Sequence, residues 1–211
     1  MRAFDLSLYL VLDPDLCAGI GMVETARQAA AGGASMIQLR DKTATTASLI
    51  ETGLALKAAL AGSRALLIVN DDIEAAVAIG ADGLHIGQAD GDPSATRARI
   101  GAGMILGVSV ETEALAAQVD PRIVDYAGVG PVFATATKPD HKQPIGWDGL
   151  VRLVAAARVP SVAIGGLKRQ HVAAVLAAGA QGLAVVSAIC GQADVRQATS
   201  QIADAIREGR R

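Results

Sequence analysis

The sequence predicts an α/β protein that forms a single (β/α)8 TIM barrel. Short apolar runs recur along its 211 residues, roughly one per 25 residues, and Ala-rich segments with helical spacing lie between them. Eight strands alternating with eight helices is the pattern typical of this barrel. An open doubly wound sheet also alternates strand and helix, but it usually has fewer strands, so the barrel is the preferred interpretation.

Eight apolar runs rich in Val, Ile and Leu are the expected strands, at residues 8–12, 35–39, 66–69, 84–86, 105–108, 126–129, 161–164 and 182–186. Between them, helical spacing is found in segments such as 22–31, 48–61, 111–119 and 168–178. Gly-Ala pairs precede several strands, as at Gly33-Ala34, Gly80-Ala81 and Gly179-Ala180. Glycine is favoured just after a helix because it can take the left-handed conformation, so these pairs predict helix ends.

No change in composition divides the chain, so we expect one barrel domain over residues 1–211. Polar clusters follow two neighbouring strands, at residues 70–72 and 87–90. In parallel α/β proteins, ligands bind at the carboxyl ends of the strands. The active site is therefore expected at that end of the barrel.

Composition argues against several classes of protein. A net charge of −2 gives no general affinity for nucleic acid, so no nucleic-acid partner is expected. No apolar run approaches the roughly 18 residues that a membrane span needs, and the early acidic residues are unlike a signal peptide. Cys17 and Cys190 lack metal-ligand spacing and are expected to be reduced, structural cysteines of a cytoplasmic protein. The oligomeric state stays open, with a homo-oligomer as one option.

The second expected strand ends in a cationic cluster, Gln38-Leu39-Arg40-Asp41-Lys42. Because side chains alternate along a strand, Gln38, Arg40 and Lys42 share one face, while Leu39 and Asp41 share the other. If Leu39 packs outward against helices, the three polar groups point into the barrel mouth. Two cations there suit a phosphate or pyrophosphate, and a solvated charge cluster is an equally weighted alternative.

Asn70, Asp71 and Asp90 lie just beyond neighbouring strands and predict a Mg²⁺ site. Mg²⁺ prefers oxygen ligands and typically takes one or two carboxylates, with substrate phosphates and water completing its shell. Asp72 is assigned to capping the following helix, and Asp92 before Pro93 is likewise expected to be a cap.

His85 lies within a strand and is interpreted as a hydrogen-bonded core residue rather than a catalytic base. The segment 128–147 is a long, chemically rich loop, and long loops in compact domains are usually functional or disordered. Thr135, Thr137 and Lys138 offer two hydroxyls and a cation there, while His141 and Lys142 are interpreted as solvated residues at its tip.

A second anion site is predicted where the seventh and eighth strands end. Gly165 and Gly166 follow the seventh, and Val186-Ser187 ends the eighth, which matches the usual phosphate site of these barrels. One cationic, metal-linked site and one amide-lined site suit the joining of a diphosphate-activated fragment to a second, phosphate-bearing fragment.

These motifs together resemble the thiamine phosphate synthase family. The matching segments are QLRDK at 38–42, NDD at 70–72, GADGLHIGQAD at 80–90, GVSVET at 107–112, GVGPVFATATK at 128–138, IGG at 164–166 and GLAVVSAI at 182–189. The resemblance covers nearly the whole chain. It implies a Mg²⁺-dependent barrel enzyme, a transferase, that joins hydroxymethylpyrimidine diphosphate to a thiazole phosphate and releases pyrophosphate. His171 stands where the family often has Asn, and the loop PDHKQP is less typical of it.

The resemblance also implies residue roles. It assigns the pyrimidine diphosphate to Gln38, Leu39, Arg40, Asp41, Lys42, Asn70, Ser109 and Lys138, of which Arg40, Lys42 and Lys138 are the expected catalytic cations. It assigns the thiazole phosphate to Thr135, Ala136, Thr137, Gly166, Val186 and Ser187. It assigns Mg²⁺ to Asp71 and Asp90.

Two alternatives stay open from the sequence. One is a thiazole tautomerase-like paralogue, since that sister group resembles the synthases in fold but generally loses the paired aspartates and the TxTK loop. The other is a non-catalytic phosphate-binding barrel, which has no need for Asp71, Asp90 and Lys138 together. This chain keeps all three residues.

Overall fold

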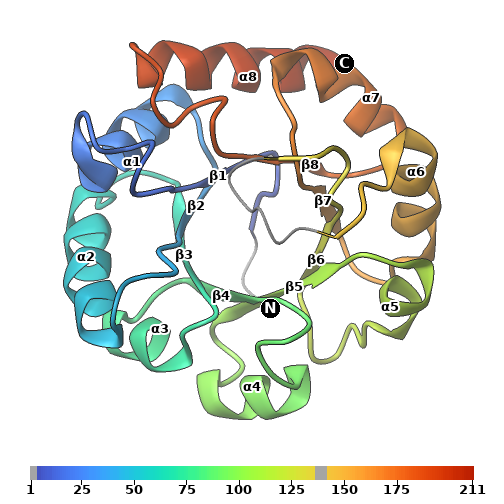
Figure 1. Ribbon diagram of the computed structural model, residues 1–211, viewed down its shortest axis with the longest axis horizontal. Helices are drawn as coiled ribbons and strands as arrows, with labels where there is room; N and C mark the ends of the chain where they lie inside the picture. Colours follow the sequence, from blue (N-terminus) through green and yellow to red (C-terminus); the bar gives the residue numbers. More distant parts are fainter. Residues whose placement is uncertain (1–3, 136–141) are drawn as a thin grey trace.

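The computed structural model describes residues 4–135 and 142–211, which form a closed barrel of parallel strands. Each strand pairs with the next along the chain, and β8 pairs with β1 to close the ring. Figure 1 shows the helices as an outer layer around this ring. The predicted (β/α)8 TIM barrel is confirmed, and closure excludes the open sheet.

The strands are β1 (Leu8–Val11), β2 (Met36–Leu39), β3 (Leu66–Asn70), β4 (Gly83–Ile86), β5 (Ile105–Val110), β6 (Tyr126–Val129), β7 (Ser161–Ala163) and β8 (Gly182–Val185). The helices are α1 (Gly21–Gly32), α2 (Thr46–Ala59), α3 (Ile73–Ile79), α4 (Pro93–Ile100), α5 (Glu113–Gln118), α6 (Gly146–Ala156), α7 (Val172–Ala177) and α8 (Val195–Gly209). A short 3-10 turn, η1 (Arg169–His171), precedes α7.

Side-chain alternation along the strands produces two apolar layers. Leu8 and Leu10 of β1 point outward and are fully buried beneath the helices. Tyr9, between them, points into the barrel and packs in an interior cluster with Met36 and Ile68. The interior is therefore filled with side chains, and a ligand can enter only at its ends.

Local capping explains where several helices begin and end. The side chains of Asp72 and Asp92 accept hydrogen bonds from backbone N–H groups three residues on, at 2.8 Å in each case, which confirms both predicted caps. Gly33 and Gly80 end α1 and α3 with φ values of 104° and 62°, as the Gly-Ala pairs predicted. Thr112 caps α5, so this helix begins at Glu113 rather than at the expected residue 111.

Cys17 and Cys190 are both free and buried, as expected for structural cysteines. In residues 4–135 and 142–211, no helix is both long and apolar enough to cross a membrane.

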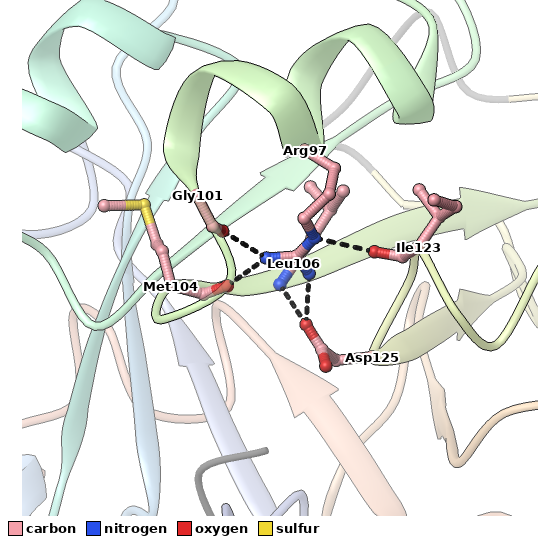
Figure 2. Close-up of polar contacts among 6 residues, drawn as sticks. All are labelled: Arg97, Gly101, Met104, Leu106, Ile123 and Asp125. Carbon is pink, nitrogen blue, oxygen red and sulfur yellow. Dashed lines mark hydrogen bonds and ion pairs between the residues drawn. The ribbon is translucent and has the colours of Figure 1, made fainter.

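The amino-terminal end of the barrel carries a polar cluster around Arg97 of α4, shown in Figure 2. Its guanidinium donates to the carbonyls of Gly101 (2.8 Å), Met104 (2.5 Å) and Ile123 (2.9 Å). It also pairs with the Asp125 carboxylate at 2.5 Å, and the same carboxylate oxygen accepts from the Leu106 backbone N–H. One side chain thus ties α4 to the loops that lead into β5 and β6.

We expect Arg97→Met to lower the free energy of unfolding by about 3–5 kcal/mol, because it leaves a largely buried carboxylate without its cation. The side chains of Arg97 and Asp125 are only 15% and 13% exposed. Urea unfolding measures the loss. The control is Arg99→Met on the same helix, since Arg99 makes one exposed 3.8 Å ion pair with Glu74 and should cost less than about 1 kcal/mol. Equal losses in the two variants would contradict a specific role for the Arg97 cluster.

Candidate active site

A cavity opens at the carboxyl ends of the strands, on the side where the sequence predicted the site. Eight of the predicted site residues line it: Gln38, Arg40, Asn70, Ser109, Thr135, Gly166, Val186 and Ser187. They come from β2, β3 and β5 and from the loops after β2, β6, β7 and β8. The barrel thus gathers residues separated by up to 149 positions, from 38 to 187, around one space.

Strand β2 divides its cationic cluster between two faces, as alternation predicted. Gln38 and Arg40 face the cavity, whereas Leu39 is 0% exposed and packs in the layer between strands and helices. The Asp41 carboxylate accepts from the backbone N–H groups of Thr43 and Ala44 and from the Thr43 hydroxyl, so it holds the turn that leaves the strand. Neither the Leu39 nor the Asp41 side chain lines the cavity, so a role of these two residues toward the pyrimidine diphosphate stays a prediction.

Lys42, Asn70 and Asp71 form a charged group at the rim. The Lys42 ammonium is ion-paired with the Asp71 carboxylate, and the Asn70 side-chain amide donates to the same carboxylate oxygen. Asp90 lies close by on the next loop, where its carboxylate accepts from the Gly87 backbone N–H at 2.9 Å. The Asp71 and Asp90 carboxylates are close enough to interact, so the structure brings these predicted neighbours together.

Burial raises the pKa of Asp71 above its usual value, and the nearby Asp90 carboxylate raises it further, while Lys42 acts in the opposite direction. Two adjacent carboxylates, one of them only 19% exposed, favour the presence of a cation. Their oxygens are the donor type that Mg²⁺ takes, so the residues present fit this ion. Among the residues with described coordinates, no group of three or more His, Cys, Asp or Glu forms a metal cage. A cation at this pair would thus need further ligands from substrate or water.

Asp71 has a backbone φ of 61°, in the left-handed region that non-glycine residues rarely adopt. Its N–H donates to the carbonyl of His85 on β4, and the next N–H, of Asp72, donates to the carbonyl of Asn70. Because of this turn, the side chains of Asp71 and Asp72 point in different directions and make different contacts. Asp72 caps α3, while Asp71 is aimed toward Lys42 at the rim.

The opposite part of the rim is built from backbone. Gly165 and Gly166 both have left-handed φ values, 94° and 66°, and follow β7 after one intervening residue, Ile164. A β-carbon at Gly166 would lie 2.8 Å from the Phe133 β-carbon and 2.9 Å from the Ala134 carbonyl oxygen. The loop after β6 therefore packs tightly on this glycine turn, and Thr135 reaches the cavity from it.

Ala136, Thr137, Lys138 and His141 lie outside the described residues, so the structure does not bear on their predicted roles. Lys142 is described, and it lines the cavity although the sequence suggested a solvated loop tip. Sequence position alone did not reveal that the chain returns to the cavity at residue 142.

Three of the further residues that line the cavity have polar side chains that sequence reasoning did not assign to it: Tyr9, His85 and Glu111. Glu111 lies two residues beyond Ser109, on the same side of the chain, so the alternation used for β2 could have found it. His85 is 7% exposed and hydrogen-bonded, as predicted for a core residue, yet it also reaches the cavity floor.

Comparison with known proteins identifies the family of this barrel. Residues 8–189 match the family model described as thiamine monophosphate synthase. The chain belongs to this family. It is 45% identical over 210 residues to a thiamine-phosphate synthase of Azorhizobium caulinodans, covering 99% of this chain and 98% of the relative. It is 47% identical over 205 residues to one of Xanthobacter autotrophicus, covering 97% of each chain.

Solved structures agree with this membership of the thiamine phosphate synthase family. A thiamine phosphate pyrophosphorylase from Pyrococcus furiosus superposes with a TM-score of 0.87 at 35% identity, covering 97% of this chain and 96% of that one. A 3-hexulose-6-phosphate synthase also superposes, with a TM-score of 0.67 at 22% identity, which reflects the shared fold alone. The protein is thus an enzyme of a transferase family, and a tautomerase-like or non-catalytic role is not favoured.

Proposed function

We propose that this enzyme couples a 4-amino-2-methylpyrimidine bearing a diphosphooxymethyl group with a thiazole phosphate, giving thiamine phosphate and pyrophosphate. The observation that carries the proposal is one cavity whose two ends differ in chemistry and are each suited to an anion. Arg40 lines one end, with Lys42 at the rim beside it, and a glycine turn at Gly165-Gly166 lines the other. A diphosphate and a monophosphate carried by two reactants suit such a pair of ends.

In this proposal, Gln38, Asn70 and Ser109 orient the pyrimidine diphosphate from the cavity wall. Arg40 and Lys42 stabilise the charge that grows on the departing pyrophosphate, with Lys138 as a third cation. A bound Mg²⁺, held by Asp71 and Asp90, would supply further charge neutralisation at the same oxygens. Thr135, Ala136, Thr137, Gly166, Val186 and Ser187 hold the thiazole phosphate.

The thiazole nitrogen already has a lone pair, so the coupling needs no general base. His85 agrees with this, because its two ring nitrogens are already engaged with Tyr126 and Ser109 at 2.9 Å each. The main task of the protein is therefore to stabilise the leaving group and hold the second reactant nearby. We place the whole activity in one barrel domain, residues 1–211, of a cytoplasmic enzyme whose reactants are small molecules.

The test is incubation with both reactants and Mg²⁺, with pyrophosphate and thiamine phosphate measured together. Both products should appear in equal amounts, and neither should form with EDTA or when the thiazole phosphate is left out. A tautomerase would interconvert thiazole forms without releasing pyrophosphate. A non-catalytic barrel would bind a phosphate and form no product. Either result would refute the synthase proposal.

Gly166 gives a prediction that separates the two ends of the cavity. We expect Gly166→Ala to raise KM for the thiazole phosphate at least about tenfold while KM for the pyrimidine diphosphate changes by less than about threefold. The reason is that a β-carbon at Gly166 must displace Phe133 or the Ala134 carbonyl beside the proposed phosphate site.

The matched control for this substitution is Gly62→Ala. Gly62 also has a left-handed φ, 80°, but nothing lies within 4 Å of a β-carbon there. It shares the backbone strain without the contact, so both KM values should stay unchanged. If Gly166→Ala weakened both reactants equally, the thiazole phosphate site would have to lie elsewhere.

A further inference from the structure

A continuous chain of hydrogen bonds crosses the barrel interior beneath the cavity. The Gln38 amide nitrogen donates to the Tyr9 hydroxyl (2.8 Å), which meets the Tyr126 hydroxyl (3.0 Å). Tyr126 in turn meets His85 Nδ1 (2.9 Å), and His85 Nε2 meets the Ser109 hydroxyl (2.9 Å). We call these five residues the buried chain. Its two ends, Gln38 and Ser109, are residues that the proposed function assigns to the pyrimidine.

The surrounding sequence makes room for the buried chain. A β-carbon at Gly107 would lie 2.1 Å from the Tyr126 ring, so β5 needs glycine there for the ring to fit. A β-carbon at Gly128 would lie 3.1 Å from the His85 ring. Tyr9 and Tyr126 are 1% and 0% exposed. Two large polar residues are thus enclosed in a core that could have been filled by aliphatic side chains, which have no hydroxyl to satisfy.

Both phenols are neutral over the working pH range. Burial raises the pKa of Tyr9 and of Tyr126 well above the ordinary tyrosine value. Each hydroxyl therefore keeps one hydrogen to donate and can accept as well. The two tyrosines can therefore influence Gln38 and Ser109 only through which atom donates and which accepts each hydrogen bond, and not through a charge.

Counting donors gives the buried chain a direction. The Tyr9 hydroxyl accepts a hydrogen bond from Gln38, and its own hydrogen can be donated to the Tyr126 hydroxyl. The Tyr126 hydroxyl then donates its hydrogen to His85 Nδ1. A neutral imidazole that accepts at Nδ1 carries its hydrogen at Nε2, which donates to Ser109. The reverse direction would leave the Tyr9 hydrogen without an acceptor among residues 4–135 and 142–211, at the free-energy cost of an unsatisfied buried donor.

The two ends of the buried chain then present fixed and opposite groups to the cavity. Gln38 uses its amide nitrogen inside the barrel, so its carbonyl oxygen is left as an acceptor. Ser109 accepts from His85, so its hydroxyl hydrogen is left as a donor. An aminopyrimidine has the complementary pair, with an exocyclic amine that donates and ring nitrogens that accept.

We propose that Tyr9, Tyr126 and His85 are positioning residues that select an aminopyrimidine by holding Gln38 as an acceptor and Ser109 as a donor. The proposal rests on the proposed function, since it concerns the pyrimidine end of the same cavity. An oxygen in place of the amine would reverse that hydrogen-bonding pattern, and the buried chain opposes the reversal. A site built to pair with a substrate donor rejects an analogue that lacks it.

The test compares two pyrimidine diphosphates, one with the 4-amino group and one with oxygen in its place, using titration calorimetry and steady-state kinetics. Tyr126→Phe keeps the ring and removes the central hydroxyl. We expect its kcat/KM for the amino compound to fall about tenfold, about 1.4 kcal/mol, and its preference for amino over oxygen to fall by a similar factor. KM for the thiazole phosphate should not change.

A double-mutant cycle distinguishes positioning from a general structural effect. In the Ser109→Ala background, Tyr126→Phe should lower kcat/KM by a smaller factor than in the wild type, because one of the two groups that it positions is already absent. The control is Thr199→Val in α8, which removes another fully buried hydroxyl, bonded to the Val195 carbonyl. Thr199→Val should leave the preference for the amino compound unchanged. If the losses of kcat/KM in Tyr126→Phe and Ser109→Ala were additive in the double mutant, the proposal would be overturned.

Nitrogen-15 NMR of the histidine rings tests the direction itself. His85, assigned by its loss in His85→Gln, should be the Nε2–H form in the wild type and a mixture of forms in Tyr126→Phe. An Nδ1–H form in the wild type would overturn the proposed direction. The test also separates failure of this proposal from failure of the proposed synthase function. If the wild type binds the pyrimidine diphosphate but does not turn it over, calorimetry still measures its preference for the amino compound over the oxygen compound. A wild type that binds neither pyrimidine overturns both proposals.

Discussion

Asp71→Asn is expected to reduce turnover at least about 10³-fold while leaving the protein folded, and Asp90→Asn should do the same. Each substitution removes one carboxylate from the proposed Mg²⁺ pair, and charge stabilisation by a metal contributes several kcal/mol to such reactions, with ~4 kcal/mol equal to about 10³ in rate. Asparagine is chosen for Asp71 because it tolerates the left-handed φ of 61° that this turn requires. The backbone that aims residue 71 should therefore be preserved.

The stability of Asp71→Asn should depend on pH in a defined direction. The pKa of Asp71 is raised in the folded state, so the folded protein binds its proton more readily than the unfolded chain does. Above the pKa that Asp71 has in the unfolded chain, the ionised carboxylate therefore lowers the free energy of unfolding. Replacing the carboxylate by an amide removes this destabilisation. We expect the melting temperature of the metal-free variant at neutral pH to equal or exceed that of the wild type. The advantage should vanish as the pH falls below the unfolded pKa.

Asp72→Asn is the matched control, since it removes the same charge one residue away. Asp72 accepts from the Ala75 N–H and from the Thr46 hydroxyl, and asparagine is as good a helix cap as aspartate. Turnover should stay within about threefold of wild type. Thermal melts with and without Mg²⁺ provide a second readout, because an ion that binds only the folded protein raises its melting temperature. That rise should be lost in Asp71→Asn and Asp90→Asn and kept in Asp72→Asn. Collapse of the fold in parallel with activity would mean that Asp71 and Asp90 are structural residues.

Much of the barrel could be predicted because its signals are local. Apolar runs coincide with the strands to within one or two residues, and Asp72 and Asp92 cap their helices as their positions indicated. Alternation along β2 correctly separated Gln38 and Arg40 from Leu39. These inferences depend only on the period of a strand and on the geometry of a helix end.

The interior of the site could not be predicted in the same way. Tyr9 and Tyr126 are 117 positions apart, and the alternation of β1 and β6 shows only that each faces inward, not that their hydroxyls meet. Asp41 looked like part of a cationic cluster, yet its carboxylate is used by the turn it begins. Such contacts depend on the curvature of the closed barrel and on the paths of loops, which no short-range pattern encodes.

The largest chemical effect should come from the substrate rather than from a mutation. Replacing the 2-methyl group of the pyrimidine diphosphate by trifluoromethyl should slow the chemical step by several orders of magnitude, each tenfold being about 1.4 kcal/mol of barrier. The reason is that the proposed site assists departure of pyrophosphate, through Arg40 and Lys42, and has no need of a base to activate the thiazole. In the dissociative route that we propose, the bond to pyrophosphate breaks before the thiazole attacks, and positive charge on the methylene carbon spreads into the aminopyrimidine ring. Electron withdrawal opposes that charge.

Single-turnover rates across a series of 2-substituted pyrimidine diphosphates decide between the two routes. Dissociative displacement predicts that the rate of the chemical step falls steeply with electron withdrawal. Binding of each analogue, measured by calorimetry, is the control, because a substituent that merely fits poorly lowers affinity rather than the rate of the bound complex. Direct displacement predicts rates that are flat or rise with electron withdrawal, since the attacking nitrogen then meets a more electrophilic carbon. With such a result, Arg40 and Lys42 would bind the diphosphate but would not stabilise a separating ion pair.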